Sequence, residues 1–274
     1  LKYLAHSNTF WNEIMFQLLL ESMRFGLLIG FLLLFSSSFA EAGEKLLQPW
    51  GYEGGAGPDH WGEMEREHEK HLQCREGQNQ SPINIVNVHE SNLVSLHFHY
   101  FETPIKIINN SHTMHLSYRE GSYVTWGDQK YELIQFHFHR PGEHLIEGKA
   151  FEMELHLVHK TPDHQYVVIA VLFEEGEYNA NLEIIWDKFP KKINLEFIHP
   201  EDIINASNLL PQDKEYVHYL GSLTTPPCSE NVSWFVLDKA LEASKDQMRN
   251  FSSYIEHNAR PAQKLNYRFI VKAK

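Results

Sequence analysis

The sequence predicts a mostly β domain with a few surface helices. Three observations lead to this prediction. Short runs rich in β-branched and aromatic residues recur along the chain, Gly, Asn, Asp and Pro separate most of them, and stretches with helical periodicity are few. The chain has 274 residues, and all-β domains of this size are often single. No repeat, low-complexity stretch or linker divides it after residue 42.

The individual elements follow from the same patterns. The segment from Pro49 to Gln80 is rich in Gly, His and Glu, and we expect it to be a lead-in to the domain. Helices are predicted over Tyr178–Lys188 and Lys239–Ser253, and Glu63–His71 has a weaker helical pattern. The predicted strands are Ile105–Ile108, Thr113–Tyr118, Leu133–Arg140, Glu152–His159, Gln165–Phe173, Tyr216–Leu220 and Ser233–Leu237.

The N-terminus resembles a targeting signal rather than part of the fold. Met23 and Arg24 precede an uncharged run from Phe25 to Phe35, and small residues follow up to Ala40. This order predicts a secretory signal peptide over residues 23–40, with the mature domain over residues 41–274. The alternative is a membrane anchor, for which the run is short, since a span needs roughly 20 residues. Residues 1–22 are interpreted as an upstream extension or a misassigned start.

The charge and the cysteines restrict the kinds of partner and compartment. The formal net charge is −12, which argues against nucleic acid as a partner because phosphate binding favours a basic surface. The two cysteines, Cys74 and Cys228, are a candidate disulfide if the chain is exported to an oxidising compartment. The alternative is a pair of buried free thiols.

Histidines on two predicted strands suggest a metal site. Alternation places Gln135, His137 and His139 on one face of their strand. On the second strand, Glu154 and His156 share a face. If both faces belong to one side of a sheet, three imidazoles converge, and three histidines with one open position are typical of catalytic zinc.

The outer groups of such a site are also present, although chance has to be considered. Gln135 and Glu154 would hold the ring N–H groups of the histidines and fix their tautomers. However, the chain has 18 histidines, and His97 and His99 have the same spacing. The pattern alone therefore leaves a metal site and a chance pairing both open.

Motifs along nearly the whole mature chain are similar to those of alpha-class carbonic anhydrases, and of the exported bacterial members in particular. The zinc-ligand set is intact and the motifs occur in the family's order. They are Trp50–Tyr52, Gly57–Trp61, Gln78–Ile85, Asn109–His112, Gln135–His139, Glu143–His144, Glu154–His159, Tyr219–Glu230 and Asn258–Gln263.

The resemblance implies an activity and a role for each residue. The activity is the reversible hydration of carbon dioxide to bicarbonate and a proton, by attack of zinc-bound hydroxide, with one Zn²⁺ per chain. His137, His139 and His156 match the zinc ligands. Thr224 matches the residue that orients the hydroxide, and Glu143 the carboxylate that holds Thr224. His112 matches the proton shuttle, a task suited to an imidazole at neutral pH.

Further positions follow from the same resemblance. Tyr52, Asn110 and His115 would hold the waters between zinc and His112, and His115 departs from the asparagine more usual there. Arg140 likewise departs from the tryptophan of the animal enzymes. The apolar pocket for carbon dioxide would be formed by Val158, Val168, Leu223 and Trp234, with Thr225 lining the same site.

The family's fold is a single α/β domain on a central, twisted, largely antiparallel sheet. The resemblance also implies a disulfide between Cys74 and Cys228 and cis bonds before Pro82 and Pro227. Sulfonamides and anions are the expected inhibitors, and we expect a monomer or homodimer with no membrane contact once the signal is removed. The expected location is the bacterial periplasm, with secretion as the alternative.

Two other functions are compatible with parts of the sequence. A non-catalytic relative that serves as a binding module would lack one or more zinc histidines, and all three are present. A different type of zinc hydrolase would be expected to carry an H-E-x-x-H motif, and the chain has none.

Overall fold

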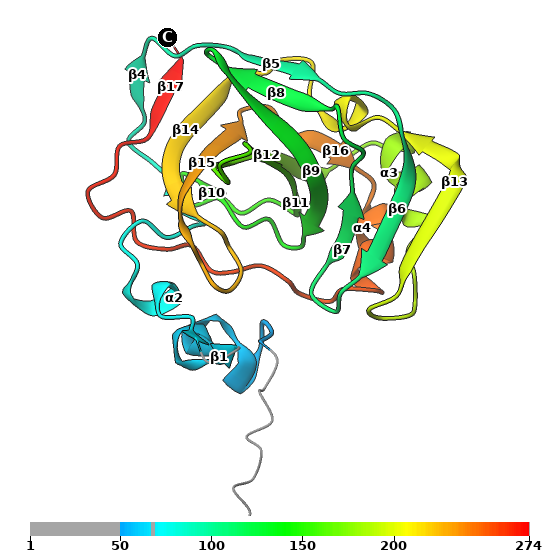
Figure 1. Cartoon of the computed structure of the whole chain (residues 1–274), viewed down its shortest axis with the longest axis horizontal. Helices are drawn as coiled ribbons and strands as arrows, with labels where there is room; N and C mark the ends of the chain where they lie inside the picture. Colours follow the sequence, from blue (N-terminus) through cyan, green and yellow to red (C-terminus); the bar gives the residue numbers. More distant parts are fainter. Residues whose placement is uncertain (1–49, 67–68, 274) are drawn as a thin grey trace, which may run out of the picture. The chain divides into compact units, whose positions relative to one another are not determined.

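One large, twisted β-sheet forms the body of the protein (Figure 1). The computed structural model describes residues 50–66 and 69–273. Most neighbouring strands are antiparallel, and parallel pairs occur where β12 meets β15 and β16 and where β17 meets β4. The predicted mostly β fold is confirmed. The predictions for residues 1–22 and for the signal at 23–40 lie outside the described residues.

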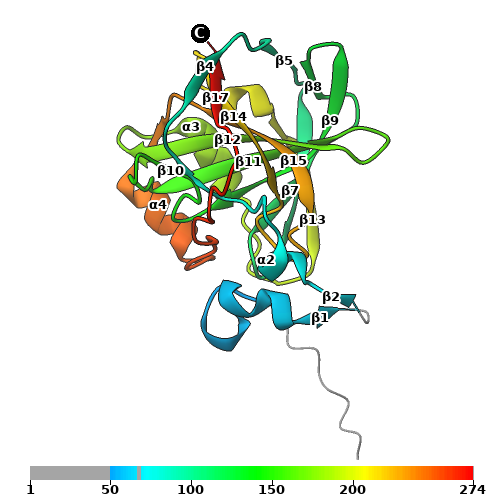
Figure 2. The same cartoon turned by 90° about the vertical axis from the view of Figure 1, so that its left-hand side faces the viewer.

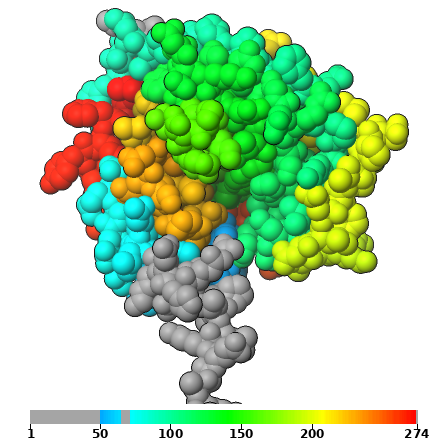
Figure 3. Space-filling view, viewed as in Figure 1, coloured from blue at the N-terminus to red at the C-terminus, as the bar shows by residue number. Residues whose placement is uncertain are grey.

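The main path of the sheet follows a strand order far from that of the chain. In spatial order the strands are β13 (Glu196–Ile204), β6 (Thr103–Asn109), β7 (Met114–Ser117), β9 (Gln129–His139), β11 (Met153–Lys160), β12 (Tyr166–Glu175), β15 (Glu230–Leu237), β14 (Tyr216–Ser222), β17 (Val271–Ala273) and β4 (His89–Ser91). In this order β13 is an edge strand, and Figure 3 shows its yellow surface at the outer rim of that view.

Shorter strands complete the β structure. Beside the main path, β16 (Leu241–Ala243) pairs with β12, and β8 (Tyr123–Trp126) pairs with both β5 (Leu96–His99) and β9. The remaining strands form two small separate sheets, β1 (Glu65–Arg66) with β2 (Glu69–Lys70), and β3 (Asn84–Ile85) with β10 (Leu145–Ile146).

The helices are few and short, and their side-chain caps explain where the longest two begin. Asn179 caps α3 (Ala180–Trp186) through two backbone N–H groups. Ser244 and Gln247 form a capping box at the start of α4 (Lys245–Ser252). The others are α2 (Gln73–Glu76), η1 (Gly54–Ala56), η2 (Pro58–Glu63) and η3 (Ala206–Leu209). No helix among the described residues is both long and apolar enough to cross a membrane.

The predicted elements agree with the structure in most cases, with two corrections. All seven predicted strands are present. The prediction of a helix over Glu63–His71 is wrong, because the chain forms the β1–β2 hairpin there, closed by the bond from the His71 N–H to the Met64 carbonyl. This polar run has no apolar stripe to bury as a helix. The helix predicted over Lys239–Ser253 begins later, because Leu241–Ala243 pairs with β12 as β16.

The two faces of the sheet have different environments. Phe136, Phe138 and Leu155 belong to the larger buried apolar cluster. Helices α3 and α4 cover this face, since Trp186 and Phe251 contact the ring of Phe138 (Figures 1 and 2). The side chains of His137, His139 and His156 alternate to the opposite face, which these helices leave open.

Covalent and backbone features hold the lead-in to the domain. Cys74 and Cys228 form a disulfide, as predicted. The bonds before Pro82 and Pro227 are cis, as predicted, and a third cis bond precedes Pro141. The guanidinium of Arg260 donates to the carbonyls of Cys74 and Ser81, which joins the lead-in to the C-terminal part of the chain.

Candidate metal centre

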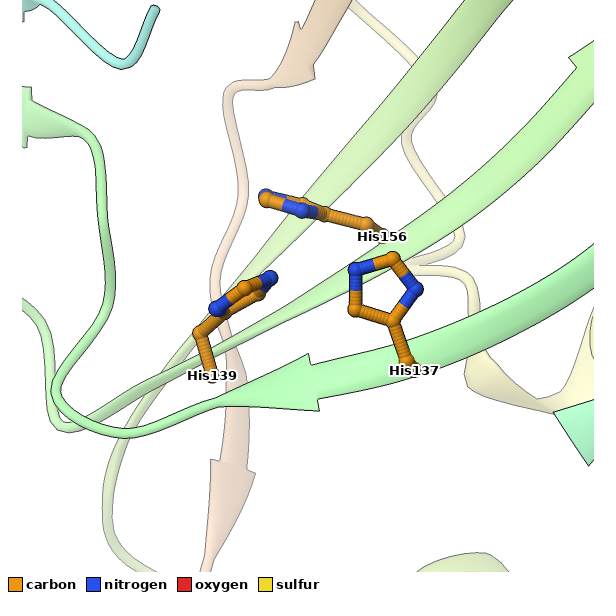
Figure 4. Close-up of side chains that lie close together, drawn as sticks. All are labelled: His137, His139 and His156. Carbon is orange, nitrogen blue, oxygen red and sulfur yellow. The ribbon is translucent and has the colours of Figure 1, made fainter. Parts of the chain in front are cut away.

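Strand register brings the three histidines together. His137 and His156 are directly opposite one another on the antiparallel strands β9 and β11, and His139 is opposite Glu154. The nitrogen atoms that the three imidazoles offer all lie within 4.8 Å of one another. Figure 4 shows the three rings turned toward a common space, with His137 and His139 on one strand and His156 on the next. The convergence inferred from alternation is therefore present.

In each imidazole, one nitrogen is bound to a hydrogen-bond acceptor and the other faces the common space between the rings. The Nδ1–H of His137 donates to Gln135 Oε1 at 2.8 Å, and the Nε2–H of His156 donates to Glu154 Oε1 at 2.7 Å. The Nδ1–H of His139 donates to the Asn258 carbonyl at 2.6 Å, and its buried Nε2 has no hydrogen-bond partner among the described residues. These bonds select tautomers whose lone pairs converge.

Burial keeps the three rings uncharged. It lowers the pKa of His139 to about 4, and it lowers the pKa of His137 and of His156 as well. For His137 and His156, the neighbouring histidines lower the pKa further. Neutral imidazoles with free lone pairs are the form that binds a metal ion. The donor set thus fits a zinc ion with three nitrogen ligands.

Glu154 is the centre of a buried hydrogen-bond network. Its Oε1 accepts from both His156 and His144 Nδ1–H, and its Oε2 accepts from the backbone N–H groups of Glu143 and His144. Despite its burial, these partners hold the pKa of Glu154 well below its usual value. Glu154 and the two histidines also lie close enough to hold a metal, but they bind one another instead.

The network continues away from the histidines to the chain before Thr224. The Nε2 of His144 lies 2.7 Å from the Tyr219 hydroxyl, which lies 2.9 Å from Ser81 Oγ. Ser81 and Ser222 are joined by two further bonds, each from a backbone N–H to the other's hydroxyl. The carboxylate that binds His156 is therefore connected to strand β14, two residues before Thr224.

Glu143 and Thr224 are buried beside the histidines. Glu143 Oε1 accepts from the Arg260 backbone N–H at 2.8 Å, and burial raises the pKa of Glu143 to about 7. The Thr224 hydroxyl lies near enough to lower this pKa. Glu143 Oε2 nevertheless has no hydrogen bond of normal length among the described residues. The Thr224 hydroxyl and the Glu143 carboxylate are therefore neighbours without a closed hydrogen bond.

His112 is located at the edge of the site, where solvent can reach it. Its ring stacks on the indole of Trp50, and burial lowers its pKa. An open pocket of about 410 Å³ is lined by His112, Trp50 and Tyr52 together with residues that follow α4. The position of His112, partly buried but open to solvent, is compatible with passing a proton between the interior and the solvent.

The residues predicted to hold waters have different environments. Tyr52 lines the pocket beside His112, and burial and the charge of Glu143 raise its pKa well above the usual value. The Oδ1 of Asn110 accepts from the backbone N–H groups of His112 and Thr113, so this atom shapes the turn. His115 is partly buried and close enough to His137 to lower the pKa of that ring. Arg140, the other departure from the animal enzymes, donates from its guanidinium to the hydroxyl of Ser252 in α4.

An apolar wall lies next to the histidines. Val158, Val168 and Trp234 form one row across β11, β12 and β15, because they are register partners. All three are buried in a second apolar cluster, and Leu223 packs against it. The ring centroids of Trp234 and His156 are 4.8 Å apart. Thr225 follows Thr224 in the turn, where its carbonyl accepts from the Cys228 N–H.

Three residues of the site were not assigned roles from the sequence. Asn258 supplies the acceptor for His139, and His144 and Tyr219 extend the Glu154 network. All three occur within the motifs that carry the family resemblance. However, a backbone carbonyl leaves no side-chain signal, and its pairing with a residue 119 positions away requires the tertiary structure.

A largely antiparallel sheet that brings three neutral imidazoles together beside a buried carboxylate network defines a class of proteins that could hold one metal ion. The model of the family described as "Eukaryotic-type carbonic anhydrase" matches residues 56–274. The chain therefore belongs to the eukaryotic-type, or alpha-class, carbonic anhydrases, and it is an enzyme of this family.

Individual relatives agree with this assignment. A carbonic anhydrase of Nostoc sp. is 39% identical over 244 residues, which is 87% of this chain and 91% of that protein. A hyperthermostable carbonic anhydrase from a hydrothermal vent chimney has a TM-score of 0.78 and 41% identity, covering 82% of this chain and all of that one. The Thermovibrio ammonificans enzyme, solved with sulfanilamide, has a TM-score of 0.78 and 37% identity, and the match covers 81% of this chain and 98% of that one.

Proposed function

We propose that the protein is a zinc enzyme that hydrates carbon dioxide reversibly to bicarbonate and a proton. The observation that carries the proposal is the convergence of His137, His139 and His156, each with its outer nitrogen bound to an acceptor. These three residues would hold the ion. As is known for carbonic anhydrases, bound zinc lowers the pKa of water from about 15.7 to about 7, which supplies hydroxide at neutral pH.

The surrounding residues would bind the substrate and orient the nucleophile. Carbon dioxide is small and uncharged, and the apolar row of Val158, Val168 and Trp234 offers a dry surface beside His156. Thr224, a close neighbour of Glu143, would donate its hydroxyl proton to that carboxylate once it is ionised. The Thr224 oxygen is then left to accept a hydrogen bond from the nucleophile, which orients the nucleophile's lone pair toward the substrate.

His112 would transfer the released proton to buffer. Its imidazole lies in the wall of the open pocket, on the turn that follows β6. Tyr52 lines the pocket, Asn110 lies in the turn itself and His115 lies on β7, and these three residues would hold the waters that connect His112 to the metal site. General acid–base groups of this kind typically contribute about 10²–10⁴-fold to a rate.

The test is stopped-flow hydration of carbon dioxide by the purified protein, with the zinc content measured on the same sample. The expected result is fast hydration with one zinc per chain and inhibition by a sulfonamide, the inhibitor class bound by the Thermovibrio relative. Hydration absent from fully zinc-loaded protein would overturn the proposal and leave a metal-binding module. Protein without zinc has to be reloaded before its rate is interpreted.

We also infer that the protein is exported, most simply to a bacterial periplasm. The Cys74–Cys228 disulfide supports this inference, because such bonds persist in oxidising compartments. Mass spectrometry of the protein recovered from its host should find an N-terminus just after Ala40 or Ala42. A recovered chain that retains residues 23–40 would contradict cleavage.

A further inference from the structure

We propose that the carboxamide of Asn258 is a positioning residue for proton transfer, because it fixes the turn that carries His112 to the strand that carries His139. The proposal rests on the proposed function of His112 as the shuttle. It concerns the side chain of Asn258, which is distinct from the backbone carbonyl that binds His139.

Asn258 is fully buried and uses every polar group that it has. Its side-chain Nδ2 donates one hydrogen to the His112 carbonyl at 3.1 Å and the other to the Phe138 carbonyl at 2.8 Å. Its Oδ1 accepts from the Arg140 N–H at 2.8 Å, and its own N–H donates to the Arg140 carbonyl at 3.2 Å. With the bond from His139, no donor and no backbone acceptor is left unpaired.

This bonding pattern is specific to a carboxamide. Two carbonyl oxygens face the Nδ2 end and an N–H faces the Oδ1 end, so only a side chain with two donors and one acceptor, at this length, satisfies them. A carboxylate would place an oxygen against the carbonyls of His112 and Phe138. An apolar residue would leave these buried backbone groups without hydrogen-bond partners, which destabilises the folded state.

The residue joins three segments far apart in the sequence. Phe138 and Arg140 flank the candidate ligand His139 at the end of β9, and His112 lies in the turn between β6 and β7. The Thr113 hydroxyl donates to the same Phe138 carbonyl at 2.8 Å, so that the turn is held to β9 at two points. Of these two, only the Asn258 bond reaches the backbone of His112 itself.

The remaining supports of His112 do not set its depth in the site. The bonds from the His112 and Thr113 N–H groups to Asn110 Oδ1 are internal to the turn. The stacked indole of Trp50 contacts the ring on one flat side. Together with the Thr113 bond and the pairing of β7 with β9, the Asn258 side chain therefore fixes where the turn sits relative to the metal-site strand. Proton transfer through ordered waters depends steeply on that placement, since small displacements of a reacting group cost large factors in rate.

The experiment compares the zinc-loaded wild-type chain with Asn258→Ala in stopped-flow hydration over a series of buffer concentrations. We expect kcat at low buffer to fall about three- to tenfold, less than the roughly 10²-fold or greater loss of a whole acid–base group. kcat/KM should fall by a smaller factor, and a high concentration of imidazole should restore kcat. When His112 is already replaced by Ala, the additional change Asn258→Ala should cause no further decrease in kcat at low buffer.

Matched controls separate positioning from general damage. Thr113→Val removes the other bond to the Phe138 carbonyl and leaves the His112 carbonyl bonded, so its kcat should depend less on buffer than that of Asn258→Ala. In metal-free protein, NMR should show that the His112 ring resonances lose part of the ring-current shift from Trp50 in Asn258→Ala only. An equal shift in both variants would overturn the proposal.

The other outcomes are equally distinct. A loss of kcat in Asn258→Ala that imidazole does not restore, or that adds fully to the loss in His112→Ala, would overturn the inference while the proposed function stands. No hydration by the wild-type enzyme, or no effect of His112→Ala, would instead refute the proposed function or shuttle. If Asn258→Ala does not fold, the solvent exchange rate of the Asn258 side-chain amide in the wild-type protein tests the proposal. Rapid exchange would contradict the two hydrogen bonds that this amide donates.

Discussion

The imidazole of His112 lies flat against the indole of Trp50, with ring centroids 3.6 Å apart and an angle of 10° between the ring planes. Such close stacking removes one face of the imidazole from water, and desolvation disfavours its charged form. It also explains why the direction of the pKa shift at His112 is downward.

We expect Trp50→Ala to raise the pKa of His112 toward its ordinary value of 6.5, because the change exposes the buried face of the ring. NMR titration of the His112 ring, identified by its absence in His112→Ala, measures this change. Tyr267→Ala, at a fully exposed aromatic residue, is the control and should leave the titration where it is. An unchanged pKa in Trp50→Ala would show that stacking is not the cause.

Removing one candidate ligand should remove the metal. The loss of an outer-shell partner typically lowers metal affinity roughly 10–100-fold, and we expect His139→Ala to lower the affinity for zinc by a larger factor. His97→Ala is a matched control, because His97 and His99 have the same two-residue spacing on β5 but are exposed. Zinc content after dialysis against a chelator distinguishes them. Full zinc in His139→Ala would contradict the assignment of this ligand.

The outer partner of His137 offers a second test of the centre. Gln135→Ala removes the acceptor for His137 Nδ1–H, so the ring loses its fixed tautomer and orientation. We expect zinc affinity to fall about 10–100-fold, measured by competition with a chromophoric chelator. Gln129→Ala, at the exposed start of the same strand, should not change the affinity. Equal affinities of the two variants would argue against a positioning role for Gln135.

The disulfide should contribute a large share of the stability. It closes a loop with a sequence separation of 154 residues, and restricting so long a loop in the unfolded chain is worth roughly 2–5 kcal/mol. We expect the double variant Cys74→Ser/Cys228→Ser to lose about this free energy of unfolding in urea titrations. A reductant should destabilise the wild type to a similar extent and leave the double variant unaffected. Similar midpoints for oxidised and reduced wild type would be the contrary result.

Acid should destabilise the protein through His159. This ring is buried, its Nε2 lies 2.7 Å from the Tyr100 hydroxyl, and burial lowers its pKa to about 3. Between pH 6.5 and 3 the unfolded chain therefore takes up a proton at this position that the folded chain does not. The free energy of unfolding therefore decreases as the pH is lowered, and this group contributes up to about 1.4 kcal/mol for each pH unit.

We expect His159→Phe to reduce this slope by about one proton, measured by urea unfolding at pH 5 and at pH 7. Tyr100→Phe is the matched control, because it removes the same hydrogen bond but leaves the histidine in place. Tyr100→Phe should retain most of the wild-type slope. Identical slopes in the wild type and His159→Phe would exclude His159 as the source of the acid sensitivity.

Residue order alone predicted which residues would form the site and indicated which way their side chains face. Strict alternation on a strand places Gln135, His137 and His139 on one side and Phe136 and Phe138 on the other, whatever the partner strand. The motif order then pointed to the family. Both inferences depend on local geometry or on residue identity.

How those faces meet depends on the tertiary structure. It set the register that places His137 opposite His156, gave His139 the carbonyl of Asn258 as its partner, and stacked His112 on Trp50. It also turned the polar run after Glu63 into a hairpin rather than a helix. The physical reason is common to the first three: each is a contact between residues distant in the chain, and local propensity carries no information about which distant group will be there.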